Sequence, residues 1–303
     1  MGIEEISIAA AHQRNAKYDE VAKENLHHPK LIAPILKAVI PEYRKYSVSE
    51  IVQFIVKDSI EDAPVDDVST VANLETEIAS VSEKLIRYDS RFKVLNPSLS
   101  DENKKISVFL HIDLEVQNNY QPTSPSYPIV KRAIYYGARE ISSQLGILTD
   151  TTNYNDIEKV YSIWICNENI PDELQNTMSS YRITKTDEIG ITDEIDSDYD
   201  LMNVVIIRRG KNTGDADIFK YLTAYFSSNI DEICNFVDIK DDEEIMEGVK
   251  KMSGLGQSIY DNAQLEMLLN LVKKGLLQIA EAAKEMNVSV EDFSKLLSEQ
   301  NKQ

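Results

Sequence analysis

Between residues 106 and 117, apolar and polar side chains alternate with a period of two. This period is typical of a β-strand whose two faces meet different surroundings. One face is entirely aliphatic, with Ile106, Val108, Leu110, Ile112, Leu114 and Val116. The opposite face carries Ser107, Phe109, His111, Asp113, Glu115 and Gln117. The pattern predicts an amphipathic strand, whose acids and amide either face water or form part of a site.

A second stretch with the same period precedes this one. Ile86, Tyr88, Ser90, Phe92 and Val94 alternate with Arg87, Asp89, Arg91 and Lys93. The segment 95–105, which is rich in turn-forming residues, joins the two stretches, so we expect an antiparallel hairpin. If the two apolar faces share one core, the polar faces coincide as well. Asp89 is then expected on the same side of the sheet as Glu115 and Gln117.

The remaining pattern predicts a mixed sheet flanked by helices, which is an α/β fold. Residues 1–60 show helical periodicity, and Ser47 and Glu50 have the spacing of a capping box. A helix is expected near 125–146, where Pro128 lies in the first turn and Gly146 ends it. Further strands are expected at 159–166, where nearly every residue is apolar, and at 179–185 and 201–209.

The same pattern divides the chain into three parts. They are an N-terminal helical region at 1–62, a core at 63–228, and an acidic helical region at 229–303. The last part ends in a helix-turn-helix-like segment at 265–297, which we expect to serve packing or assembly. Its second helix offers Glu291, Asp292 and Lys295, a poor set for a groove lined with phosphates. A homo-oligomer or a protein partner is expected to use these C-terminal helices.

Charge is distributed unevenly along the 303 residues. Fifty-one acids against 32 bases give a net charge of −19, which repels nucleic acid over most of the surface. Between Glu83 and Glu140, however, nine Lys or Arg stand against seven Asp or Glu, a net charge of +2, which leaves −21 elsewhere. The predicted hairpin therefore lies in the one segment where a phosphate backbone is not repelled.

Other classes of protein are disfavoured by the sequence. No run of about 18 apolar residues is present, and the N-terminus has acids where a secretory signal carries bases. Cys166 and Cys234 lack the CxxC spacing of a zinc site or redox motif, and two cysteines make no disulfide framework. We expect a cytoplasmic protein with neither a membrane span nor export.

Asp89, Glu115 and Gln117 together suggest metal chemistry. Two carboxylates and an amide on neighbouring strands can hold Mg²⁺, which prefers oxygen ligands and keeps several waters. Such an ion activates water and neutralises the charge that builds on a phosphate during cleavage. From the spacing alone, a solvent-facing polar strand explains the same pattern, and both interpretations stay open.

Four segments in order resemble the PD-(D/E)XK nuclease family transposases, bacterial proteins grouped with the recombination-promoting nucleases. They are YDSRF at 88–92, DLEVQNNY at 113–120, YPIVKRAIYYGAR at 127–139 and KVYSIWIC at 159–166. The resemblance spans about 18–169, extends more loosely through 200–211, and includes the C-terminal tail. It implies a restriction-endonuclease-like core, in which acids on adjacent strands bind the metal.

Carried over by position, the resemblance makes Asp89 and Glu115 the metal ligands and Gln117 the final polar residue of the motif. Glu77 matches an upstream acid of similar sequences, and the neighbouring Glu75 is an alternative for that place. The implied activity is hydrolysis of DNA phosphodiester bonds with Mg²⁺, or Mn²⁺ in its place. The implied setting is recombination or mobile elements.

Gln117 departs from the general pattern, because many nucleases of this type have Lys there. An amide carries no positive charge and takes no proton near neutral pH. Gln117 is therefore expected to orient the water or a phosphate oxygen, leaving activation to the metal. Two alternatives remain open: an inactive descendant that acts as a protein-interaction module, and a nuclease directed at RNA.

Several further side chains are assigned around this site. Arg132, Tyr136 and Arg139 have helical spacing, so they form one face of the helix at 125–146. Either this face leans over the site and binds phosphate, as Arg87 and Arg91 are also expected to do, or its arginines pair with surface acids. Asp113 is expected to raise the negative potential, His111 to cap the sheet edge, and Trp164 to lie in the core.

Overall fold

The structure is a computed structural model in which the described residues form two compact units. One unit comprises Leu26–Tyr225 with Asp231–Ile239, and the other the remaining segments, ending with Lys240–Gln303. The description covers residues 21–22, 24–56, 59, 90–97, 109–122, 125–145, 151–286, 289–290, 293–295 and 297. Each unit is considered by itself.

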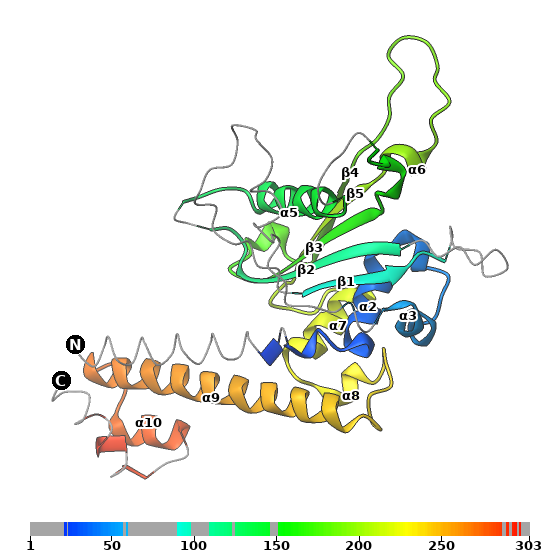
Figure 1. Cartoon of the computed structure of the whole chain (residues 1–303). Coiled ribbons are helices and arrows are strands. Elements are labelled where there is room, and N and C mark those ends of the chain that lie inside the picture. Colours follow the sequence, from blue (N-terminus) through cyan, green and yellow to red (C-terminus); the bar gives the residue numbers. More distant parts are fainter. Residues whose placement is uncertain are drawn as a thin grey trace. The chain divides into compact units, whose positions relative to one another are not determined.

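A five-stranded mixed sheet organises the larger unit, with strand order β1-β2-β3-β5-β4 (Figure 1). β1 pairs antiparallel with β2, the strands β2, β3 and β5 run parallel, and β4 pairs antiparallel with β5. Helices flank the sheet, which confirms the predicted α/β class. The strands are β1 (Ser90–Leu95), β2 (Phe109–Asn119), β3 (Lys159–Glu168), β4 (Thr177–Arg182) and β5 (Met202–Arg208).

The pairing of β1 with β2 confirms the antiparallel arrangement expected from the two alternating stretches. Ser90 pairs with Leu114, and Phe92 with Ile112. Leu114, Ile112 and Phe92 are all buried on one face, as their period of two requires. The beginning of the predicted first strand, at 86–89, and that of the second, at 106–108, lie outside the described residues.

The segments N-terminal to the sheet contact the backbone of β1. Tyr43, in a 3₁₀ turn (Pro41–Tyr43), donates its hydroxyl to the Leu95 carbonyl at 2.7 Å. Ile55 forms an isolated β-bridge with Val94. The turn lies between helices α2 (Pro29–Val39) and α3 (Val48–Phe54), and the predicted capping box of Ser47 and Glu50 starts α3.

Helix α5 (Ile129–Ser143) connects β2 to β3 and packs on the opposite face of the sheet. Its buried side chains form one cluster with residues of β3 and β5: Ile129, Ala133, Tyr136, Trp164, Cys166, Val204 and Ile206. Trp164 is therefore a core residue, as predicted. Because Trp164 pairs with Glu115 across β3 and β2, α5 covers the sheet face that carries the acidic positions of β2.

Gly137 lets α5 approach the sheet closely. A Cβ at this position would lie 3.1 Å from Met202 Sδ and 3.6 Å from Ser162 Cβ. We expect Gly137→Leu to destabilise the fold by roughly 1–3 kcal/mol, because the added side chain has no space between helix and sheet. Urea denaturation measures the loss. Ala138→Leu, at the exposed neighbouring position, is the matched control, and an equal loss there would refute the explanation.

The remaining helices lie between β4 and β5 or after β5 along the chain. They are α6 (Asp196–Tyr199), before β5, and α7 (Asp217–Phe226), α8 (Ile230–Ile233), α9 (Glu243–Lys273) and α10 (Ile279–Glu285). Short 3₁₀ turns occur at Tyr154–Asp156 and Asp172–Leu174. None of the helices in the described part combines the length and apolar character needed to cross a membrane.

The smaller unit has a hydrophobic cluster of its own. Leu268 and Leu269 of α9 pack with Ala282 and Ala283 of α10 and with Phe293. The predicted helix-turn-helix-like segment at 265–297 thus begins within the long helix α9. The packing role assigned to it agrees with this cluster, whereas a partner for it stays a prediction.

Candidate active site

Glu115 lies on the sheet face that α5 covers and is only 1% exposed. Gln117 follows two residues later on the same face, where it pairs with Cys166 of β3 and is half-buried. Burial under α5 means that Glu115 does not lie on a solvent-facing strand surface. A buried carboxylate is costly to leave unpaired, so its immediate surroundings matter.

Arg132 of α5 provides a cation next to this carboxylate. Its Nη2 donates to the Tyr136 hydroxyl at 2.8 Å, and its guanidinium lies 5.2 Å from the centre of the Trp164 ring. Burial lowers the pKa of Arg132, but the Tyr136 hydrogen bond and the negative charge of Glu115 outweigh that effect and raise it. Arg132 therefore stays charged and is held in place by two aromatic side chains.

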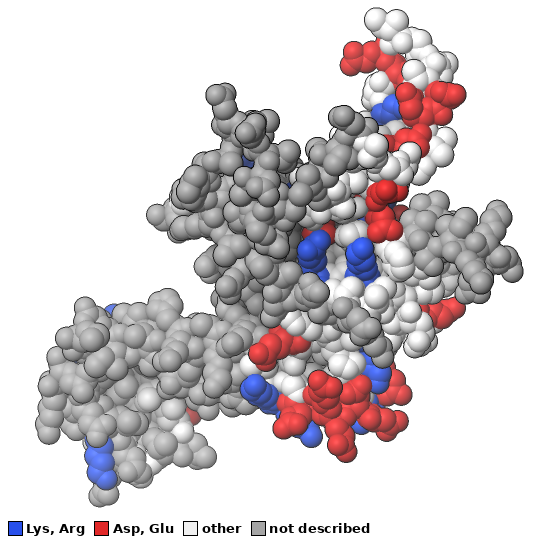
Figure 2. Space-filling view, viewed as in Figure 1, with Lys and Arg blue, Asp and Glu red and all other residues white. Residues whose placement is uncertain are grey.

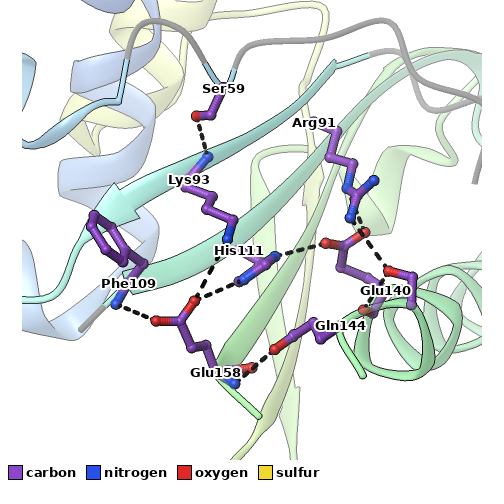
Figure 3. Close-up of polar contacts among 9 residues, drawn as sticks. Ser59, Arg91, Lys93, Phe109, His111, Glu140, Gln144 and Glu158 are labelled. Atoms are coloured by element: carbon purple, nitrogen blue, oxygen red, sulfur yellow. Dashed lines mark hydrogen bonds and ion pairs between the residues drawn. The ribbon is translucent and has the colours of Figure 1, made fainter. Parts of the chain in front are cut away.

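Glu140, one turn after Tyr136 on α5, joins the helix to both strands of the antiparallel pair (Figure 3). Its side chain is fully buried, and its oxygens lie 2.8 Å from Arg91 Nε of β1 and 2.8 Å from His111 Nδ1 of β2. Burial would raise the pKa of Glu140, but the His111 hydrogen bond and the Arg91 charge hold it below its ordinary value.

Glu158, the residue directly before β3, contacts the other side of His111. Its Oε2 lies 3.0 Å from His111 Nε2, and its Oε1 accepts a hydrogen bond from the Phe109 backbone N–H at 3.0 Å. Lys93 of β1 lies 3.9 Å from the same carboxylate. Side chains from β1, β2, α5 and the start of β3 thus form one polar network around His111 (Figure 3).

The expectation that His111 caps the sheet edge is wrong. The residue is 5% exposed and lies on β2, which is paired on both sides, by β1 and β3. It is buried because the two carboxylates satisfy both ring nitrogens. Glu140 and Glu158 were not identified from the sequence, although the spacing of four that links Arg132 and Tyr136 extends to Glu140.

A further cation, the buried Arg208 at the end of β5, lies on the same sheet face. Its Nη1 donates to Ser179 Oγ at 3.1 Å, and its guanidinium lies 5.6 Å from the centre of the Tyr120 ring. Arg208 pairs with Cys166, which pairs in turn with Gln117. Burial raises the pKa of the Cys166 thiol to about 11, so this cysteine is protonated near neutral pH.

Several predicted site residues fall outside the described part of the chain. Asp89, Glu77 and Arg87 are among them, as is Glu75, and for Asp113 only the backbone is described. Within the described residues, no group of three or more His, Cys, Asp or Glu side chains is placed to hold a metal ion. Arg91, Arg132, Tyr136 and Arg139 are all described, and the last three lie on α5. Arg91 lies on β1 and forms an ion pair with Glu140.

On the α5 face, the described contacts of Arg132 are with aromatic side chains. Its Nη2 donates to the Tyr136 hydroxyl, and its guanidinium lies near the Tyr136 and Trp164 rings. Phosphate binding and pairing with surface acids both stay predictions for this face. Arg139 is half-buried on the same helix, and its role as a phosphate contact stays a prediction.

Comparison with known proteins identifies the segment that contains these residues. Residues 88–216 match a family described as PD-(D/E)XK nuclease family transposase. The matched range includes all five strands and α5, and with them Glu115, Gln117 and Arg132. No curated protein and no solved structure matches the chain.

The match confirms the resemblance seen in the motifs, over the part of the chain that forms the sheet. It also agrees with the fold, because a mixed sheet with flanking helices is the arrangement expected of a restriction-endonuclease-like core. The family implies a nuclease linked to mobile elements. Residues 88–216 of this chain thus match the PD-(D/E)XK nuclease family transposases, over somewhat less than half of its length.

Proposed function

We propose that the protein is a metal-dependent nuclease that hydrolyses DNA phosphodiester bonds. The main support is the position of Glu115, a buried carboxylate on the sheet face beneath α5, with Gln117 two residues away and the charge of Arg132 beside it. A carboxylate, an amide and a fixed cation on one face can serve metal-assisted phosphate cleavage, as a metal ligand, an orienting group and a phosphate contact.

Asp89 is the proposed second ligand of the metal ion. It directly precedes Ser90, the first residue of β1, and Ser90 pairs with Leu114. We propose that the antiparallel ladder continues by one residue, which would bring position 89 opposite Glu115. Directly opposed residues in such a pair have Cβ atoms about 4.5–5.5 Å apart, which is close enough for two carboxylates to share one ion. Glu77 is proposed to assist, directly or through water.

Mg²⁺, or Mn²⁺ in its place, supplies the activation of water and the neutralisation of phosphate charge when it is bound. Asp89 and Glu115 would hold the ion through their carboxylate oxygens, which are the ligands that Mg²⁺ prefers. Gln117 offers an amide N–H to a phosphate oxygen and an amide carbonyl to the attacking water. It accepts no proton, so it acts by orientation.

Arg132 is the best supported of the proposed phosphate contacts. Its guanidinium is fixed by Tyr136 and Trp164, which lowers the entropy lost when it binds an anion. Arg91 already pairs with Glu140, so part of its guanidinium is occupied. It is proposed to contribute positive charge near the phosphate more than direct hydrogen bonds to it. Arg87, Tyr136 and Arg139 complete the proposed set.

The proposal is tested with purified protein and supercoiled plasmid in Mg²⁺, in Mn²⁺ and in chelator. Nicking that requires metal is the expected result. A parallel single-stranded RNA substrate separates the DNA nuclease from an RNA nuclease, because a metal-assisted site does not itself distinguish the sugars. If neither substrate is cut and calorimetry detects no metal binding, an inactive protein-interaction module becomes the better explanation.

Gln117 allows a finer test of this mechanism. We expect Gln117→Ala to slow metal-dependent cleavage by about 10–100-fold, because the water loses an orienting group while the ligands stay in place. Gln117→Lys should retain activity, since Lys occupies this position in many nucleases of this type. Initial nicking rates at saturating Mg²⁺ give the comparison. An unchanged rate in Gln117→Ala would remove the residue from the mechanism.

A further inference from the structure

The segment 183–195, here called the arm, projects from the sheet between β4 and α6 (Figure 1). Lys185 ties its two limbs together, because its Nζ donates to the Thr192 carbonyl at 2.8 Å and lies 3.1 Å from Glu194. Gly190 turns the chain at the tip with a φ of +74°, a conformation that glycine adopts without strain. The arm is thus a cross-linked protrusion.

Apolar side chains are unusually exposed on the arm and on the adjoining strand β4. Ile189 and Ile191, which flank Gly190 at the tip, are 98% and 92% exposed. Six of the twelve large hydrophobic side chains that are exposed in the described part of the chain lie within 178–195. Exposed apolar groups gathered in one place mark a surface that another molecule covers. The six are Met178, Tyr181, Ile183, Ile189, Ile191 and Ile195.

β4 itself is an edge strand, at the end of the order β1-β2-β3-β5-β4. Within the described strands it pairs only with β5. Edge strands expose unpaired backbone groups, and proteins usually protect them with charged side chains, proline or bulges. The centre of β4 carries only Ser179 and Ser180, and its one charged residue is Arg182 at the end. Such an edge is suited to the addition of another strand.

We infer that β4 and the arm form a two-fold interface with a second copy of this chain. In a symmetric antiparallel pairing, β4 meets the same strand about its centre, at Ser179 or Ser180. The end of β4 that leads into the arm then lies beside the beginning of β4 in the second copy. That position is next to the loop 209–211, because Lys211 N donates to Gln175 Oε1 and Gly210 N to Asn176 Oδ1.

The charges at these two places are complementary. The arm carries four acids, Asp187, Glu188, Asp193 and Glu194, against the single base Lys185, and Figure 2 shows acidic and uncharged residues dominating this protrusion. The loop 209–211 carries two bases, Arg209 and Lys211, and no acid. An acidic arm is repelled by nucleic acid, so its apolar tip fits a protein surface with a basic rim. In the proposed dimer, the loop 209–211 of the second copy supplies this basic rim beside the arm.

Sedimentation equilibrium of the full chain tests this inference, which does not depend on the nuclease activity. We expect a reversible dimer, and Ile189→Asp combined with Ile191→Asp should raise its dissociation constant at least about tenfold. Tyr154→Asp, at a position that is 63% exposed elsewhere in the same unit, is the matched control and should leave the dimer intact. Circular dichroism establishes that the variants remain folded.

Two further variants test the geometry. Ser179→Cys or Ser180→Cys should give a disulfide-linked dimer on mild oxidation, because residues on the two-fold axis of an antiparallel pair fall within disulfide distance. Glu188→Lys and Lys211→Glu should each weaken the dimer by roughly two- to fivefold, and the double variant should restore it.

Three results would overturn the inference. A monomer at every accessible concentration would exclude the interface. A dimer that withstands the substitutions at Ile189 and Ile191 would place the contact elsewhere, for instance on the C-terminal helices. Failure of both the cysteine cross-link and the charge exchange would refute the pairing of β4 with itself.

Discussion

Asp89→Asn and Glu115→Gln are each expected to reduce metal-dependent plasmid nicking by about 10³-fold or more. Removing one of the two proposed ligands forfeits several kcal/mol of transition-state stabilisation, and each 1.36 kcal/mol is a tenfold change in rate. The substitutions keep the size of each side chain, so the fold should persist. Initial rates with Mg²⁺ measure the loss, and calorimetry should show weakened metal binding in the same variants.

Asp187→Asn is the matched control for this prediction. Asp187 lies on the arm, where its carboxylate contacts Lys185 at 3.5 Å, so its loss should leave nicking unchanged. Wild-type rates in both Asp89→Asn and Glu115→Gln would eliminate the proposed site. Loss in Glu115→Gln alone would keep Glu115 in the site and point to another partner, for which Glu77 and Glu75 are the first residues to test.

Glu140→Ala should have the largest effect on stability, with a loss of about 3–5 kcal/mol. Glu140 is fully buried between Arg91 and His111, and removal of one partner leaves buried groups without compensation. The network holds α5 against β1 and β2, so the substitution should also loosen the cover over Glu115. Urea denaturation followed by circular dichroism measures the change in the free energy of unfolding.

The effect of pH follows from the lowered pKa of Glu140. A carboxyl whose pKa is lower in the folded state stabilises the fold above its unfolded pKa and loses that contribution as pH falls through the folded value. The difference between the wild type and Glu140→Ala should therefore be greatest near neutral pH and shrink below about pH 4. Glu188→Ala, on the exposed arm, should change stability by less than about 0.5 kcal/mol at any pH. If the loss of unfolding free energy in Glu140→Ala does not vary with pH, the charge of Glu140 is not the source of its stabilising effect.

Much of the sheet was predictable because its signals are local. The alternation at 109–117 and the turn-rich segment before it define an amphipathic strand in an antiparallel pair, and the apolar run at 159–166 defines a strand buried on both faces. Both signals depend on backbone geometry that repeats every two residues. Their agreement with the structure reflects the strong burial of one or both faces.

The surroundings of the candidate site were less predictable. The alternation shows that Glu115 and His111 share a face, but it does not show that α5 covers this face. His111 and Glu140 are 29 positions apart, and their contact exists only because the connection from β2 to β3 returns the helix over the sheet. A polar strand face that looks solvated in sequence can therefore be buried.

The sequence by itself determined the strands, the helix that follows them, the family of residues 88–216, and the acids and amide that make Glu115 a metal-site candidate. Only the tertiary structure decided that Glu115 is buried beside Arg132, that Glu140 and Glu158 enclose His111, and that β4 is an edge. The physical reason is the separation along the sequence of the residues that determine each property. Secondary structure follows from neighbours within a few residues, whereas burial and charge pairing depend on which distant segments the packing brings together.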